Sequence, residues 1–161
     1  MASYLLALAI GEFDRVSARH DAVELSILVP PGEAAKGQQA MTWSQGLLRW
    51  FEDYFQQPYA LPKLDQIAIP AKGLAMENWG LITYPESWIL YDPANATADK
   101  DFYTHGILAH EIGHQWFGNL VTMAWWDDLW LNESFADWMA AKILMQLYPT
   151  YHTEIREAES A

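Results

Sequence analysis

The residues with the clearest chemistry are the two histidines of a short motif, HEIGH, at positions 110–114. Residues four positions apart lie on the same face of a helix, so His110 and His114 can reach one point in space. A further acid, Glu133, follows after eighteen intervening residues. Catalytic zinc commonly takes two histidines and one glutamate as protein ligands and keeps one position for water. The spacing therefore predicts one Zn²⁺ ion held by His110, His114 and Glu133.

The glutamate inside the motif, Glu111, is rotated away from the line of the two imidazoles and is not needed as a ligand. Bound zinc lowers the pKa of a water molecule from its bulk value toward about 7. Glu111 can accept the proton of that water as it attacks a carbonyl, and can then deliver the proton to the leaving amine. We interpret Glu111 as the catalytic residue of a zinc-dependent hydrolase.

A second carboxylate, Asp137, follows Glu133 by four residues and lies on the same face of a predicted helix. Two interpretations stay open: an acid that orients a ligand histidine through a hydrogen bond, or a solvated acid on an outer turn. Asn132 is interpreted as a residue at the helix start. The remaining histidines fall outside the ligand spacing and are interpreted as surface or core residues: His20, His105 and His152.

The elements that position these residues follow from hydrophobic periodicity. Strands are expected at four apolar or alternating segments: 4–10, 23–29, 64–69 and 78–84. Helices are expected at three segments with helical spacing: 38–56, 99–117 and 131–147. Asp99 and Asp101 are suited to cap the helix that carries the motif. An extended piece, a turn and a loose polar tail are expected at 120–124, 125–128 and 151–161. This order predicts a mixed α+β fold, a small mixed sheet with flanking helices.

The composition limits the classes of function. The chain has 161 residues, the length of one ordinary domain, and a net charge of -12, which argues against nucleic acid and anionic membranes as partners. The absence of cysteine excludes disulfides and thiolate metal sites. No apolar run is long enough to predict a membrane span. The redox compartment stays open, and a cytoplasmic location is favoured over a periplasmic or secreted one.

Two motifs carry a resemblance to a known family. The segment HEIGHQWFGNLVTMAWWDDLWLNESFADWM, residues 110–139, resembles the zinc-site segment of the aminopeptidase N-like metallopeptidases, the gluzincin aminopeptidases. About thirty residues upstream, Ala75-Met76-Glu77-Asn78 resembles the exopeptidase motif of that family, Gly-x-Met-Glu-Asn. The order of the motifs agrees, and the resemblance covers nearly the whole chain.

This resemblance implies a thermolysin-like (zincin) catalytic domain and an aminopeptidase activity. It implies that Glu77 binds the free α-amino group of a peptide, and that Ala75, Met76 and Asn78 contact the substrate along a strand edge. The residues alone leave Glu77 open between this role and that of a surface acid. The first motif position departs from the family because it holds Leu74 where glycine is usual, which is expected to reshape the substrate groove.

The resemblance also implies a longer polypeptide. We expect residues 1–29 to be the end of a β-rich N-terminal domain, 30–150 a partial catalytic domain and 151–161 a polar tail. The family places an oxyanion-stabilising tyrosine some sixty residues beyond the glutamate ligand, so weak turnover is expected from these 161 residues alone. The remaining domains are expected to pack on exposed apolar surface. Two alternatives stay open: a zinc endopeptidase of the same class, and an inert zinc-binding fragment.

Overall fold

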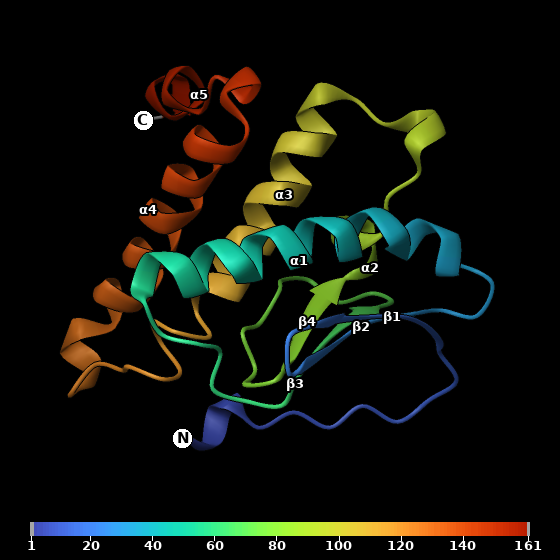
Figure 1. The fold of residues 1–161 in the computed structure, drawn as a ribbon, viewed down its shortest axis with the longest axis horizontal. Helices are drawn as coiled ribbons and strands as arrows, with labels where there is room; N and C mark the ends of the chain where they lie inside the picture. The colour runs from blue at the N-terminus through green and yellow to red at the C-terminus, as the bar shows by residue number, and fades with distance from the viewer. Residues whose placement is uncertain (1, 161) are drawn as a thin grey trace.

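Four short strands form a mixed sheet in the computed structural model, which describes residues 2–160 (Figure 1). The strands lie in the order β1-β2-β3-β4 and comprise Asp14–His20, Val23–Val29, Lys63–Ile69 and Leu81–Pro85. β1 and β2 form an antiparallel hairpin, whereas β2, β3 and β4 run parallel. Parallel strands need a crossover connection, and α1, Ala34–Phe55, supplies it between β2 and β3.

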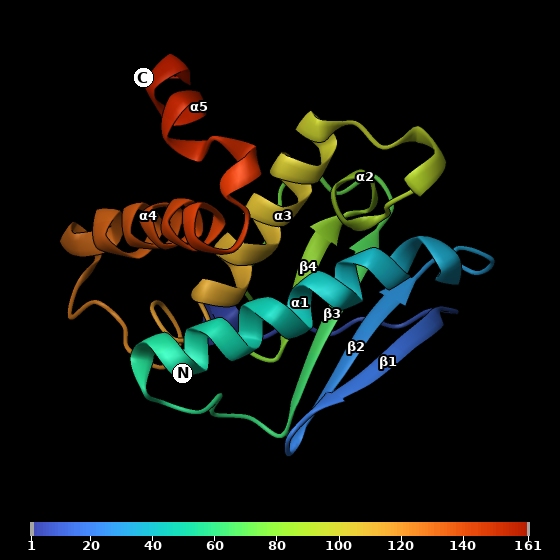
Figure 2. The ribbon, with the colours of Figure 1, turned by 45° about the horizontal axis from the view of Figure 1, so that its top comes forward.

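Helices cover the sheet and extend beyond it. α1 packs on β1 and β2. α3 (Ala98–Gly113) contacts both α1 and α4 (Leu129–Leu147), and Figure 2 shows it beside both helices. A single turn, α2 (Glu86–Ile89), follows β4, and α5 (Thr153–Ser160) packs on α4. None of the helices in the described residues is long and apolar enough to cross a membrane.

The end of α3 is anchored by close packing on α1. A side chain at Gly113 would meet the ring of Phe51 at 3.1 Å, so glycine allows the two helices to approach closely here. Phe51 is fully buried, and Trp116 stacks on it with the ring centroids 5.6 Å apart. This aromatic contact belongs to the main hydrophobic core, and it fixes the helix end that carries the histidine motif.

The α+β fold class with a small mixed sheet and flanking helices is confirmed. The strands expected at 23–29 and 64–69 are confirmed within one residue. The helix expected at 38–56 begins earlier, at Ala34. The helix expected at 131–147 begins two residues earlier than expected, at Leu129.

The strand expected at 4–10 is wrong. This segment overlaps a 3₁₀ turn, Ser3–Leu5, and continues in a stretch that belongs to no strand, in which Leu6, Leu8 and Ile10 are exposed. The apolar run at residues 4–10 was misleading, because a strand also needs a neighbouring strand to pair with, and apolar composition does not show whether one is present. The true first strand is β1, whose charged residues concealed it from a periodicity argument.

Other boundaries also differ from expectation. The motif helix ends at Gly113 and not at Phe117, and Thr97 caps its start by accepting a hydrogen bond from the Lys100 amide. The strand expected at 78–84 begins at Leu81, because a tight turn precedes it. The extended piece at 120–124 is reduced to one bridge, from Val121 to Phe117. The predicted turn at 125–128 contains a 3₁₀ turn at Trp126–Asp128, and the tail expected to be loose forms α5.

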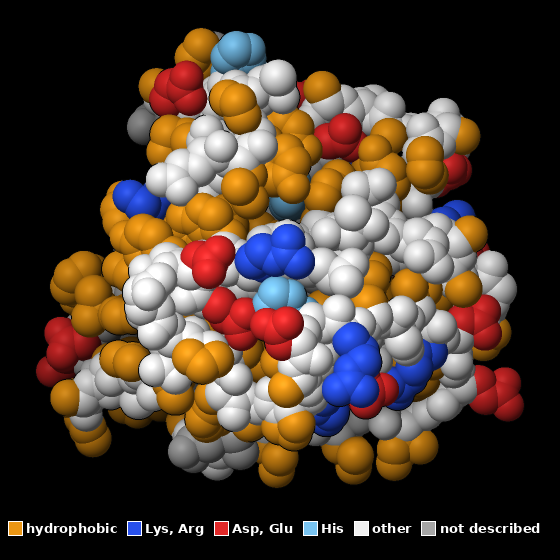
Figure 3. All heavy atoms as spheres, viewed as in Figure 1, with side chains coloured by type: hydrophobic (Ala, Val, Ile, Leu, Met, Phe, Trp, Pro, Cys, Tyr) orange, Lys and Arg blue, Asp and Glu red, His pale blue; other side chains and the backbone are white. Residues whose placement is uncertain are grey.

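The division into domains stays a prediction. The sheet passes through the expected boundary at residue 29, because β2 pairs with β3. Several large side chains are exposed, and Figure 3 shows apolar side chains gathered along the edges of one face. The exposed tryptophans are Trp125, Trp126, Trp130 and Trp138.

A buried histidine makes the fold sensitive to acid. His105 is fully buried, stacks on Trp43 and lies beside Tyr148 and Tyr151. Burial lowers the pKa of His105 to about 3, so the unfolded chain takes up a proton before the folded chain does.

Folding stability should therefore fall as the pH decreases from about 6.5 to about 3, by up to about 1.4 kcal/mol per pH unit from this group. His105→Phe removes the proton uptake and should flatten the pH dependence of the melting temperature in that window. The exposed His152→Asn variant is the control and should keep the wild-type slope. An unchanged slope in His105→Phe would contradict this assignment.

Candidate metal centre

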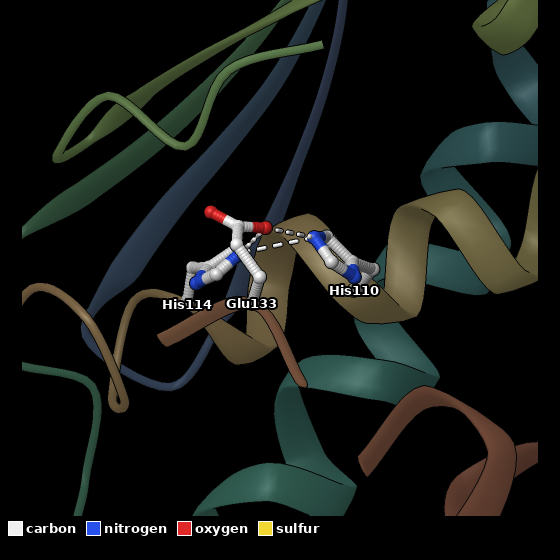
Figure 4. A group of neighbouring side chains, drawn as sticks. All are labelled: His110, His114 and Glu133. Carbon is white, nitrogen blue, oxygen red and sulfur yellow. Dashed lines mark hydrogen bonds and ion pairs between the residues drawn. The ribbon is translucent and has the colours of Figure 1, made fainter. Parts of the chain in front are cut away.

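Three electron-rich atoms converge from α3 and α4 (Figure 4). The Nε2 atoms of His110 and His114 are 2.9 Å apart. Glu133 Oε2 lies 3.3 Å from Nε2 of His110 and 3.5 Å from Nε2 of His114. The structure thus brings together the three residues that the sequence predicted as ligands.

The hydrogen bonds behind the histidines orient their rings. His110 Nδ1 lies 2.8 Å from Asp137 Oδ1, and His114 Nδ1 lies 3.2 Å from the carbonyl oxygen of Phe117. A carboxylate and a carbonyl can only accept, so both Nδ1 atoms must be donors. In the neutral imidazoles, both Nε2 lone pairs then point toward Glu133, which is the tautomer that a metal requires.

The donor set suits zinc. Zinc–nitrogen and zinc–oxygen bonds of about 2.0–2.1 Å in a tetrahedral site place neighbouring ligand atoms about 3.3 Å apart. The three separations of 2.9, 3.3 and 3.5 Å surround that value. Contact with His110, and then with His114, holds the pKa of Glu133 well below its usual range, so this predicted ligand is a carboxylate.

Glu111 lies beside this centre without joining it. The side chain is only 7% exposed, and its Oε2 atom has no hydrogen-bond partner among the described residues. Burial raises the pKa of Glu111 to about 7, and the positions of His110 and His114 oppose that rise. A buried carboxyl whose pKa lies near neutrality can both accept and return a proton.

A cavity of about 700 Å³ opens beside Glu111. It lies between α3 and α4, with Glu111, His110 and Asp137 on its polar side. The rest of its lining is largely apolar and includes Trp88, Phe102, Tyr103, Trp138 and Leu144. The cavity therefore offers an apolar space next to the predicted catalytic group.

The second motif lies in the connection that leads into β4. Met76 forms two backbone hydrogen bonds with Thr83 of β4, of 2.8 and 3.0 Å, so the motif follows the edge of the sheet. Glu77 and Asn78 come next and are each 6% exposed. The amide of Asn78 accepts from the Thr83 hydroxyl, while Ala75 packs against the core. The strand edge expected for this motif is therefore present.

Glu77 lies close to the predicted metal ligands. Asn132 Nδ2 is 3.5 Å from Glu77 Oε1 and 3.2 Å from Glu133 Oε1, so one amide lies between the two carboxylates. Asn132 lies in the first turn of α4, as expected for a residue at the helix start, and it is buried, with 4% of its surface exposed. Leu74, at the position where glycine is usual, is 71% exposed and points away from the core.

Three further residues at this site were missed in the sequence. Gln115 and Asn119 donate hydrogen bonds of 3.2 and 2.8 Å to the carbonyl oxygen of Glu77. Tyr4 lies near enough that burial, and then the charges of Glu77 and Glu133, raise the pKa of its phenol. The only signal for Gln115 and Asn119 was their position directly after the histidine motif. No sequence signal pointed to Tyr4, because its segment was expected to be a strand.

A known protein family matches the part of the chain that contains both motifs. Residues 39–160 match the model of the peptidase family M1 domain. The chain belongs to peptidase family M1.

Relatives in this family carry aminopeptidase names. A leucyl aminopeptidase of Saccharolobus solfataricus is 46% identical over 154 residues, which is 94% of this chain and 19% of that protein. A glutamyl aminopeptidase of Bos taurus is 48% identical over 138 residues, 84% of this chain and 14% of that protein. An aminopeptidase N of Acetobacter pasteurianus is 43% identical over 141 residues, 86% of this chain and 40% of that protein. The chain therefore spans less than half the length of these M1 relatives.

Asp137 contacts His110 and is also 76% exposed, so the orienting role stays a prediction beside that of a solvated acid. Asp137→Ala should weaken zinc binding by about 10- to 100-fold, because the imidazole loses the partner that fixes its tautomer. Asp137→Asn keeps an acceptor oxygen and should lose less. The affinity can be measured by competition with a chelator of known strength, with the exposed Asp127→Ala as control. Equal affinities for all variants would identify Asp137 as a solvated acid.

A glycine makes the turn after the histidine motif possible. Gly118 has a φ of +131°, and a Cβ atom there would lie 2.3 Å from Asn132 Oδ1. Gly118→Ala should destabilise the fold by about 1–3 kcal/mol from backbone strain, and further through the clash.

Gly46 is a matched control, since it lies in α1 with nothing within 4 Å of an added Cβ. Gly46→Ala should raise stability by about 0.5–1 kcal/mol through its better helix propensity. Denaturant unfolding of the two variants should therefore give shifts of opposite sign. A neutral Gly118→Ala would contradict the proposed constraint.

Proposed function

We propose that this chain carries the zinc site and amine-binding site of an aminopeptidase, which hydrolyses the N-terminal peptide bond of peptides. The main support is the short distance between the two sets of charged groups. A single amide, that of Asn132, lies within 3.5 Å of both Glu77 and Glu133. A peptide whose ammonium group pairs with Glu77 would therefore have its first peptide bond close to the metal ligands.

In this proposal His110, His114 and Glu133 hold one Zn²⁺ ion. When bound, zinc supplies a Lewis acid that polarises the carbonyl and activates a water. Glu111 holds the proton that this water loses and returns it to the leaving amine. Asp137 keeps the His110 ring in the tautomer that leaves Nε2 free. Glu77 binds the substrate ammonium, and Ala75, Met76 and Asn78 line the path of the peptide backbone along the edge of β4.

Two other functions remain as alternatives. A zinc endopeptidase would use the same metal ligands but would gain nothing from a buried carboxylate beside them. An inert zinc-binding fragment would hold the metal without turnover. Several expectations stay predictions. They are weak turnover by these 161 residues alone, a peptide partner with a free N-terminus, and packing of further domains on the exposed apolar surface. The same holds for the expected lack of nucleic-acid binding and for a cytoplasmic location.

Glu111→Gln tests the catalytic role. The variant keeps the shape of the side chain but cannot accept a proton, so zinc content should be unchanged while peptidase turnover falls by about 10²- to 10⁴-fold. Metal content and activity are measured on the same zinc-loaded sample, before and after a chelator. Turnover at the wild-type rate by Glu111→Gln would remove this residue from the mechanism.

Substrate pairs separate the aminopeptidase from the endopeptidase. A peptide with a free N-terminus should be cleaved strongly in preference to its N-acetylated twin, because acetylation removes the charge that pairs with Glu77. Glu77→Gln should greatly reduce this preference. Equal cleavage of the two peptides by the wild type would favour the endopeptidase.

A further inference from the structure

Three buried amide side chains surround Glu77. Gln115 and Asn119 both donate to its backbone carbonyl, at 3.2 and 2.8 Å. Asn132 approaches its carboxylate, with Nδ2 at 3.5 Å from Oε1. The exposed fractions are 1%, 6% and 4%, so water does not readily substitute for these hydrogen bonds. We call Gln115, Asn119 and Asn132 the amide cradle.

Each residue of the amide cradle is adjacent in sequence to a predicted metal ligand or is hydrogen-bonded to its backbone. Gln115 directly follows His114, and Asn132 directly precedes Glu133. Asn119 is held by its own backbone amide, which donates to the His114 carbonyl at 3.0 Å. Any movement of the metal-bearing segments would therefore carry the cradle with it.

Gln115 also closes the turn after Glu77. Its Oε1 atom accepts from the Gly80 amide at 3.2 Å, and the Tyr59 hydroxyl lies 3.4 Å from the same atom. The side chain thus uses both ends, with its Nε2 on Glu77 and its Oε1 on Gly80. The segment that carries Glu77 is held at both ends of its turn by a residue adjacent to a metal ligand.

We propose that the amide cradle is a set of positioning residues that holds the Glu77 carboxylate at a fixed distance from the metal ligands and thereby sets selectivity for a free N-terminus. This inference rests on the proposed role of Glu77 as the amine-binding residue. The neutral amides suit this task, because they donate to Glu77 without cancelling the negative charge that binds an ammonium group.

A purely structural role would have a different consequence. The cradle hydrogen bonds could stabilise the loop before β4 without affecting ligand selectivity. Removing a donor would then lower the melting temperature and leave the preference for a free amine unchanged. Selectivity measured on folded, zinc-loaded variants separates the two roles.

The test compares two zinc-binding probes on the full chain by titration calorimetry. Leucine hydroxamate carries a free amine, whereas N-acetyl-leucine hydroxamate carries the same zinc-binding group without it. Asn119→Leu and Asn132→Leu keep the side-chain volume and remove the donors. Each should reduce the ratio of the two affinities by about 10- to 100-fold, since a buried hydrogen bond near a charged group is lost. The exposed Asn95→Ala variant is the control and should keep the wild-type ratio.

The outcomes are distinct. A wild-type ratio in both leucine variants, with zinc bound and the fold intact, would overturn the cradle while leaving Glu77 as the amine-binding residue. A wild type without preference for the free amine, matched by Glu77→Gln, would overturn both the proposed function and this inference. Where a leucine variant does not fold, Asn119→Ala and Asn132→Ala are measured in its place, with the same ratio as readout.

Discussion

Two imidazole nitrogens and one carboxylate oxygen face one another between α3 and α4, within 3.5 Å of each other. Lone pairs at such distances repel unless a proton or a metal cation lies between them. Asp137 and the Phe117 carbonyl occupy the other ring nitrogens, so the histidines cannot relieve the repulsion by changing tautomer. The arrangement is therefore suited to a cation, and the rest of the site is built around it.

The ten residues from His110 to Asn119 serve several purposes at once. The helical part aligns the two histidines and packs its last turn, Gly113, on Phe51. The chain then leaves the helix, so that Gln115 and Asn119 turn toward Glu77. One short segment thus packs against the core, carries two of the predicted metal ligands and holds the second motif. The helix ends at Gly113, four residues before the expected end at Phe117.

Parts of this protein were predictable because they depend on local geometry. The histidines at i and i+4, and the approximate extents of α1, α4, β2 and β3, follow from repeats that a helix or strand imposes on its own sequence. The strand expected at 4–10 failed because pairing needs a neighbour that apolar composition cannot specify. The strand β1 is rich in charged residues and has no clear apolar pattern. It is a strand because it pairs with β2, and the sequence of β1 alone does not show this pairing.

The sequence by itself determined the residue types at the predicted metal site, the spacing of the two histidines along the chain and the family to which the chain belongs. Only the tertiary structure decided that Asp137 contacts His110 and that Asn132 lies between Glu77 and Glu133. It also decided that a segment more than thirty residues upstream meets the end of α3. These contacts join residues far apart in the chain, and their distances depend on how the helices pack against the sheet edge. No local repeat encodes such packing, so it becomes visible only in the folded chain.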